Sequence, residues 1–274
     1  MRRGIVVCLV GAASACSLFT SLNGFSNGDA TDGGPSTTDA AATDAPTDAV
    51  SDGTADGGRY CATVDATFCE DFDDPADPSF SRWKPSIDMS AMLTPAEGYS
   101  PPSSLQATTP PITNTDQLGA YLTTSFPNVA RVRYHFRFRI DAAGSDISTM
   151  MLFQVESLDT AGNRAGLRLR FEKGEFALAG AIYPKNGAGT FPDVGLHHVA
   201  DVGKWHEMSV SVDWTKSPAE VSATYDATNI AANAPLAGAT FGPATFIVYA
   251  GIYYSAGPAT TWRARVDDIT VDTQ

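Results

Sequence analysis

Basic residues concentrate between positions 131 and 173, where they alternate with apolar residues. The set is Arg131, Arg133, Arg137, Arg139, Arg164, Arg168, Arg170 and Lys173. Guanidinium groups bind carboxylates through paired hydrogen bonds, so these side chains could bind an acidic glycan or neutralise a uronate carboxylate during an elimination. They could instead pair across strands with acids such as Glu172, Glu207 or Asp213. The sequence leaves both alternatives open.

The alternation around these basic residues is typical of β-strands. Between positions 131 and 140 the apolar side chains are Val132, Tyr134, Phe136, Phe138 and Ile140, and every intervening residue is Arg or His. A period of two places the apolar side chains on one face of a strand and the cationic ones on the other. The same pattern recurs at 167–172 and 206–214. One face should therefore enter a core while the other remains polar.

Further strand segments are separated by turn-forming Gly, Pro, Asn and Asp residues. They are expected at 120–125, 149–157, 175–183, 221–225, 245–254 and 262–271. The pattern indicates no long amphipathic helix. So many strands in one domain of about 215 residues predict an all-β fold of two packed antiparallel sheets, a sandwich or jelly roll.

The N-terminus has the features of a lipoprotein signal. Arg2 and Arg3 precede an apolar stretch too short to span a bilayer, and small residues lead to Cys16. We expect a signal peptide at 1–15 and a lipidated Cys16, by which the protein would be held at the bacterial outer membrane or cell surface. The alternative is an ordinary secretory peptide, which also takes the protein out of the cytoplasm.

The residues after Cys16 have a composition that cannot bury a core. Seven aspartates between positions 29 and 56 are spaced by Thr, Ala, Gly, Ser and Pro, and no Lys or Arg occurs between Arg3 and Arg59. Such a segment predicts a disordered tether at 16–58, followed by one folded domain at 59–274. The formal net charge of -13 and the isoelectric point near 4.5 argue against nucleic acid and anionic lipid head groups as partners. Membrane contact would be made only through the lipid.

Two cysteines remain in the predicted domain. Cys61 and Cys69 form an even pair in an exported chain, which predicts a disulfide that holds the first strand of the domain. A zinc site is the alternative, but no Cys-x-x-Cys occurs and the histidines are distant in sequence.

Three short segments resemble the concanavalin A-like lectin and glucanase superfamily, including its laminin-G-like members. They are Phe-Cys-Glu-Asp-Phe at 68–72, Gly-Lys-Trp-His at 203–206 and Ala-Arg-Val-Asp-Asp-Ile-Thr-Val at 264–271. The resemblance covers most of the chain after Arg59 and implies a jelly roll whose first and last strands lie close together. Glu70 and Asp71 would then approach Asp267 or Asp268, and these carboxylates could bind a structural calcium ion. Alternatively, the acids cap strand ends or pair with neighbouring arginines.

The superfamily includes enzymes that cleave glycans. Its retaining glucanases carry Glu-x-Asp-x-x-Glu, and no Glu-x-Asp occurs in this chain. Gln154-Val155-Glu156 and the segment 249–253 resemble strand motifs of alginate lyases, in which Tyr253 would accept or donate a proton. Glu156 stands where those lyases have His, and Tyr249 stands where they have Lys. The resemblance therefore implies a polysaccharide lyase only as an alternative, and no catalytic residue is assigned.

Exposed aromatic rings would supply platforms for sugar rings. Of the candidates Trp83, Trp205, Trp262, Tyr253 and Tyr254, we expect Tyr254 and Trp262 at the surface because both are out of phase with the apolar pattern of their strands. The predicted ligand-binding residues are Arg133, Arg137, Arg139, Arg168, Arg170, Gln154, Tyr254 and Trp262. The sequence thus favours a noncatalytic carbohydrate-binding or adhesion domain for a glycan or envelope polysaccharide. A lyase acting on a uronate-containing glycan and a structural envelope protein are the alternatives.

Overall fold

The computed structural model describes residues 60–74, 80–113, 117–143, 149–172, 174–186, 188–199, 201–236, 244–256 and 260–274. The chain divides into two units, Met1–Asp52 and Gly53–Gln274, and the described residues belong to the second. The predicted signal peptide at 1–15, the lipidated Cys16 and the tether at 16–58 lie outside the described residues.

The described elements are almost all strands. In chain order they are η1 (Tyr60–Ala62), β1 (Phe68–Glu70), β2 (Lys84–Ile87), β3 (Met92–Glu97), β4 (Ser103–Thr109), β5 (Gln117–Val129), β6 (Arg131–Ala142), β7 (Thr149–Leu158), β8 (Arg164–Glu172), β9 (Glu175–Tyr183), β10 (Asp193–Val199), β11 (Trp205–Asp213), β12 (Ala219–Tyr225), β13 (Thr228–Leu236), β14 (Ala244–Ala256) and β15 (Trp262–Thr273). Every predicted strand segment lies within one of these strands, except that Trp214 follows the end of β11. Within these residues, no helix is long and apolar enough to cross a membrane.

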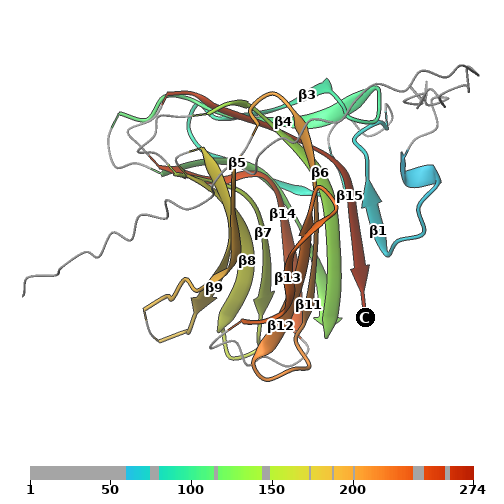
Figure 1. Cartoon of the computed structure of the whole chain (residues 1–274). Coiled ribbons are helices and arrows are strands. Elements are labelled where there is room, and N and C mark those ends of the chain that lie inside the picture. The colour runs from blue at the N-terminus through green and yellow to red at the C-terminus, as the bar shows by residue number, and fades with distance from the viewer. Residues whose placement is uncertain are drawn as a thin grey trace, which may run out of the picture. The chain divides into compact units, whose positions relative to one another are not determined.

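The strands form two antiparallel sheets. Sheet A has the order β13-β12-β11-β6-β15-β4-β3, with β1 added beside β15, and sheet B has the order β10-β9-β8-β7-β14-β5-β2. In Figure 1 the sheets lie face to face as two layers, and the strands of both are bent along their length. This architecture confirms the predicted jelly-roll sandwich.

Aromatic side chains join the two layers. Phe136 on β6 of sheet A lies 4.5 Å from Phe153 on β7 of sheet B, measured between ring centroids. Phe171 on β8 meets Trp262 on β15 edge to face at 5.6 Å. These residues alternate along their strands with polar ones, so the period of two places the apolar half of each strand between the sheets.

The domain begins beside its last strand, as the resemblance implied. β1 pairs with β15, and Cys69 lies opposite Thr270. Cys69 is bonded to Cys61 in η1, which confirms the predicted disulfide. The bond therefore fixes the start of the domain to the edge of β15.

Two of the four acids expected at a calcium site lie near the end of β1, and each already has protein donors. Glu70 Oε2 accepts hydrogen bonds from Arg82 Nη2 at 2.9 Å and from Trp83 Nε1 at 3.0 Å. Asp71 Oδ2 accepts a hydrogen bond from the Cys61 backbone N–H at 3.0 Å. These contacts hold the segment after β1 against the sandwich.

The other two acids lie on β15 and hold a different loop. Asp267 Oδ2 accepts the backbone N–H groups of Tyr99 at 2.7 Å and Ser100 at 3.2 Å. Asp268 pairs with Arg137 on β6. Among the described residues, no group of three or more His, Cys, Asp or Glu side chains is arranged to hold a metal ion. The expected calcium site, made jointly by Glu70, Asp71, Asp267 and Asp268, is therefore not assembled, because the two pairs of acids are bonded to different loops.

Replacing Cys61 and Cys69 with Ser should lower the free energy of unfolding by roughly 2.5 kcal/mol, the value expected when a short loop is no longer closed in the unfolded chain. Urea unfolding of the wild type and the double variant measures the difference. Equal free energies of unfolding would contradict this account of how β1 is held.

Asp267 should make stability fall as pH rises. Burial, together with the charge of Asp268, raises its pKa to about 8, although three backbone N–H groups act in the opposite direction. Between about pH 4 and pH 8 the folded state therefore retains a proton that the unfolded state releases.

The variant Asp267→Asn carries no such proton. Its free energy of unfolding relative to the wild type should rise with pH across this window, by at most about 1.4 kcal/mol per pH unit, and then level off. Urea unfolding at several pH values measures this difference, with Asp272→Asn on the same strand as the control. A relative stability that does not change with pH would exclude a raised pKa.

Candidate functional site

The arginines that the sequence groups together lie on opposite sheets. Arg133, Arg137 and Arg139 are on β6 of sheet A, while Arg168 and Arg170 are on β8 of sheet B. In both strands the intervening residues enter the core, so the arginines lie on the outer face of each sheet. The five predicted ligand-binding arginines therefore lie on two separate surfaces, because the two strands belong to different layers.

Most arginines of β6 have acidic partners. Arg137 pairs with Asp268 and also with Glu207, at 3.3 Å. Arg139 Nε lies 2.6 Å from an oxygen of Asp141. On this face of sheet A the salt-bridged alternative holds, and these charges are already compensated.

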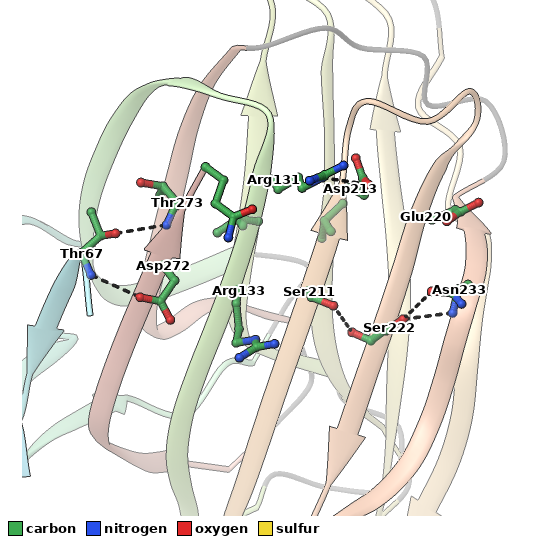
Figure 2. Close-up of a pocket in the computed structure, with 13 residues that line it drawn as sticks. Thr67, Arg131, Arg133, Ser211, Asp213, Glu220, Ser222, Asn233, Asp272 and Thr273 are labelled. Carbon is green, nitrogen blue, oxygen red and sulfur yellow. Dashed lines mark hydrogen bonds and ion pairs between the residues drawn. The ribbon is translucent and has the colours of Figure 1, made fainter. Parts of the chain in front are cut away.

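A polar cleft of about 440 Å³ surrounds Arg133 on the outer face of sheet A (Figure 2). At one side, Arg131 pairs with Asp213 at 3.0 Å. Across β12 and β13, Ser222 Oγ donates a hydrogen bond to Asn233 Oδ1 at 3.1 Å. The lining contains charges of both signs and the hydroxyl groups of Ser and Thr side chains. Such a lining is typical of a sheet face that is exposed to water.

The outer face of sheet B has a different character. Gln154 on β7 lies opposite Arg168 on β8 and Tyr249 on β14, so the three form one row across neighbouring strands. All three side chains point away from the core, because the residues next to them along each strand, such as Phe153 and Val155 beside Gln154, lie inside it. Even so, their exposed fractions are only 2% for Gln154, 6% for Arg168 and 8% for Tyr249. Polar side chains with so little exposure on an outer face indicate a concave surface. We call this surface the sheet B trough, and we define it by Gln154, Glu156, Arg164, Arg168, Tyr249 and Tyr253.

Glu156 is the centre of the hydrogen bonds in the trough. Its Oε2 accepts a hydrogen bond from Gln154 Nε2 at 2.6 Å and one from the Tyr249 hydroxyl at 3.3 Å. Arg164 Nε lies 3.3 Å from its other oxygen. Burial raises the pKa of Glu156 more than Arg164 and the two hydrogen bonds lower it. Glu156 is thus a buried carboxylate of raised basicity.

Three tyrosines lie beside Glu156. Tyr121 on β5 contacts Tyr249 and Tyr253 on β14, with ring centroids 5.7 Å and 5.2 Å away. Burial, and then the charge of Glu156, raise the pKa of both Tyr249 and Tyr253, so both phenols keep their protons at neutral pH. Next to them opens a cleft of about 380 Å³, lined by Glu156, Gly162, Arg164, Tyr183, Pro184, Lys185 and Tyr253.

Arg168 has no acidic partner within the part of the chain that the structure describes. Its guanidinium lies 3.2 Å from the sulfur of Met151 and 4.3 Å from the ring centre of Phe191. Among the described residues, no carboxylate oxygen lies within salt-bridge distance of it. Beside it, Gln154 Oε1 is buried and has no hydrogen-bond partner in the described part of the chain. Within the described residues, the trough therefore holds a cation without a salt-bridge partner next to an acceptor without a donor.

The remaining predicted ligand-binding residues differ in how exposed they are. Arg170 is partly exposed, with Nε 3.6 Å from Glu172 Oε2. Tyr254 is half-buried at a bulge of β14, so it is not the open platform that we expected. The prediction that Trp262 is exposed is wrong: it is 0% exposed, because it packs against Phe171 between the sheets.

Two residues that contact the trough, Tyr121 and Phe191, have only weak signals in the sequence. Tyr121 alternates with the core residues Ala120 and Leu122, which could have placed it on an outer face. Phe191 precedes β10, and no periodic pattern marks it. Which outer residues meet is decided by the strand order of sheet B, which one sequence does not reveal.

The comparisons with known proteins give structural relatives only. No protein-family model and no curated protein matches the chain. An endo-β-1,4-glucuronan lyase from the fungus Trichoderma reesei has a TM-score of 0.57 at 13% identity, covering 77% of this chain and 96% of its own. The cellulose induced protein Cip1 has a TM-score of 0.52 at 13% identity, covering 76% and 97%. The alginate lyase vAL-1 from a Chlorella virus has a TM-score of 0.50 at 8% identity, covering 77% and 100%.

At such low identity these similarities show the fold alone. The folded domain of this chain is a concanavalin A-like jelly-roll sandwich.

Proposed function

We propose that the sheet B trough binds a uronate-containing polysaccharide and cleaves it by β-elimination. The observation that carries this proposal is Arg168, which is 6% exposed and has no carboxylate partner among the described residues. A buried charge without a partner is strongly unfavourable. A carboxylate of the ligand would compensate it with a charge-assisted hydrogen bond, so the trough selects an acidic sugar over a neutral one.

The other trough residues fit the chemistry of elimination. In this reaction a base removes the proton on C5 of the uronate, and the electron pair of the C5–H bond forms the C4–C5 double bond. The C4–O4 bond breaks, its electron pair stays on O4, and an acid gives O4 a proton. Glu156 is the base, because burial raises its pKa, and Tyr253 is the acid, because its phenol keeps its proton.

Arg164 and Lys185 line the same cleft as Glu156 and Tyr253. They supply positive charge for the enolate that forms when the C5 proton leaves. The structural neighbours support the same reaction class, since two of them are named as lyases of glucuronan and alginate.

A noncatalytic glycan-binding domain is the second candidate. Its specific support is Glu156, which stands where the lyase motif has His and which already binds Gln154, Tyr249 and Arg164. If these contacts persist with ligand bound, the carboxylate does not reach the C5 proton. In that case the trough retains its cation and its acceptor but performs no chemistry.

We place this activity outside the cytoplasm, on a lipid anchor at Cys16. The support is the lipoprotein-like sequence at 1–16 and the disulfide between Cys61 and Cys69, since disulfides form and persist in oxidising compartments. The acidic segment at 16–58 would give the domain reach to an extended polymer.

The Arg168→Met variant should bind a polyuronate about 10- to 100-fold more weakly, because it loses a charge-assisted hydrogen bond while it keeps a long apolar side chain. Affinity electrophoresis through gels containing glucuronan or alginate measures the change. The matched control is Arg133→Met on sheet A, which should migrate like the wild type. Equal retardation of the two variants would remove Arg168 from the binding site.

Cleavage by the wild type should produce an unsaturated uronate, which is followed by its ultraviolet absorbance. Tyr253→Phe and Glu156→Gln should each slow this reaction at least about 100-fold, the loss expected for a missing general acid or base. If the wild type is retarded by the polyuronate gel and forms no unsaturated product, the noncatalytic candidate replaces the lyase.

A further inference from the structure

A separate cleft of about 220 Å³ lies on sheet A, where β11 begins. It is lined by Tyr99, Arg137, Trp205, His206, Glu207, Asp226 and Ala227. It is smaller than the pockets of roughly 300–1,000 Å³ that enclose drug-sized ligands, so it suits one ring of a longer molecule. It shares no residue with the sheet B trough.

Two aromatic rings form one wall of this cleft. Tyr99 is 50% exposed and meets Trp205 edge to face, with ring centroids 6.0 Å apart. The guanidinium of Arg137 lies 4.1 Å from the centre of the Tyr99 ring, and that of Arg139 lies 5.6 Å from the Trp205 ring. Cation–π contacts of this kind fix both rings before any ligand arrives, which lowers the entropy lost on binding.

Two carboxylates also line the cleft. The side chains of Glu207 and Asp226 are 45% and 43% exposed. Asp226 is held in place, since its Oδ1 accepts the Glu207 backbone N–H at 2.8 Å and its Oδ2 lies 2.8 Å from His206 Nδ1. Both acids thus keep oxygen lone pairs directed to solvent, where sugar hydroxyls can donate to them.

The charge of this cleft is opposite to that of the trough. Its guanidinium, from Arg137, is already paired with Asp268 and Glu207. When the neighbouring His206 is neutral, Asp226 leaves the lining with excess negative charge, which repels a uronate carboxylate. Aromatic rings beside two acceptors instead suit the apolar face and the hydroxyl groups of a neutral sugar.

We propose that the cleft formed by Tyr99, Trp205, Glu207 and Asp226 is a second carbohydrate site, which binds a neutral hexose residue of a polysaccharide. The rings stack on the sugar while the two carboxylates accept its hydroxyl groups. This site lies on the other sheet and does not depend on the activity proposed for the trough. With both sites occupied, the domain would contact an acidic and a neutral glycan, or two stretches of one mixed polymer.

Affinity electrophoresis of the purified protein through gels containing mixed-linkage glucan, galactomannan or hydroxyethyl cellulose tests this proposal. The wild type should be retarded by at least one of these neutral polymers. Tyr99→Ala and Glu207→Gln should each weaken that retardation about 10-fold or more, because one loses the platform and the other an acceptor. Ile87→Ala, which truncates an equally exposed apolar side chain, is the control and should behave as the wild type.

Two results would overturn the second site. One is migration of the wild type without retardation in all three gels, and the other is retardation that Tyr99→Ala and Glu207→Gln leave unchanged. Far-ultraviolet circular dichroism of each variant shows whether it is folded. A polyuronate gel run in parallel reports on the trough alone, so failure of one site is distinguished from failure of the other.

Discussion

Aromatic packing between the two sheets determines where every polar side chain of the domain lies. Phe136 meets Phe153 across the layers, and Trp262 meets Phe171. With these rings in the core, the alternation of side chains along a strand places the intervening residues of β6 and β8 on the outer faces of the sheets. A shift of one residue in either strand would bury its arginines and expose its aromatic rings. The core therefore creates two separate chemical surfaces from strands of similar sequence.

The two outer faces differ in whether their arginines have acidic partners, and the proposed function rests on this difference. On sheet A, Arg137 is compensated by Asp268 on the neighbouring β15, and Arg139 by Asp141 on its own strand. On sheet B, Arg168 lies in an enclosed trough against Met151 and Phe191, without a described carboxylate within salt-bridge distance. Evolved cores rarely retain a buried cation without a partner, and functional sites are where such exceptions concentrate. The same difference explains why one domain can offer a site for an acidic sugar on one sheet and a site for a neutral sugar on the other.

Much of the fold follows from local sequence pattern, whereas little of the site does. Strict alternation at 131–140 predicts β6 correctly, and the paired Cys61 and Cys69 predict the bond that holds β1. Strands such as β3 and β13 have no such prediction, because Pro, Ala and Asn interrupt their alternation. Local pattern also fails for Trp262, because an irregularity between Asp267 and Thr270 shifts the alternation of β15, so Trp262 faces the core although it is out of phase with the end of the strand. The site depends on which strands are neighbours, and that arrangement brings together Gln154, Arg168 and Tyr249 from strands that the sequence cannot order.

The most direct test of the account is a crystal structure of the protein soaked with a short glucuronan oligosaccharide. The account predicts that the sugar lies in the sheet B trough, with one uronate carboxylate bonded to the guanidinium of Arg168 and with Glu156 and Tyr253 beside the neighbouring glycosidic bond. An oligosaccharide bound only on the outer face of sheet A, or one in the trough whose carboxylates all avoid Arg168, would contradict it.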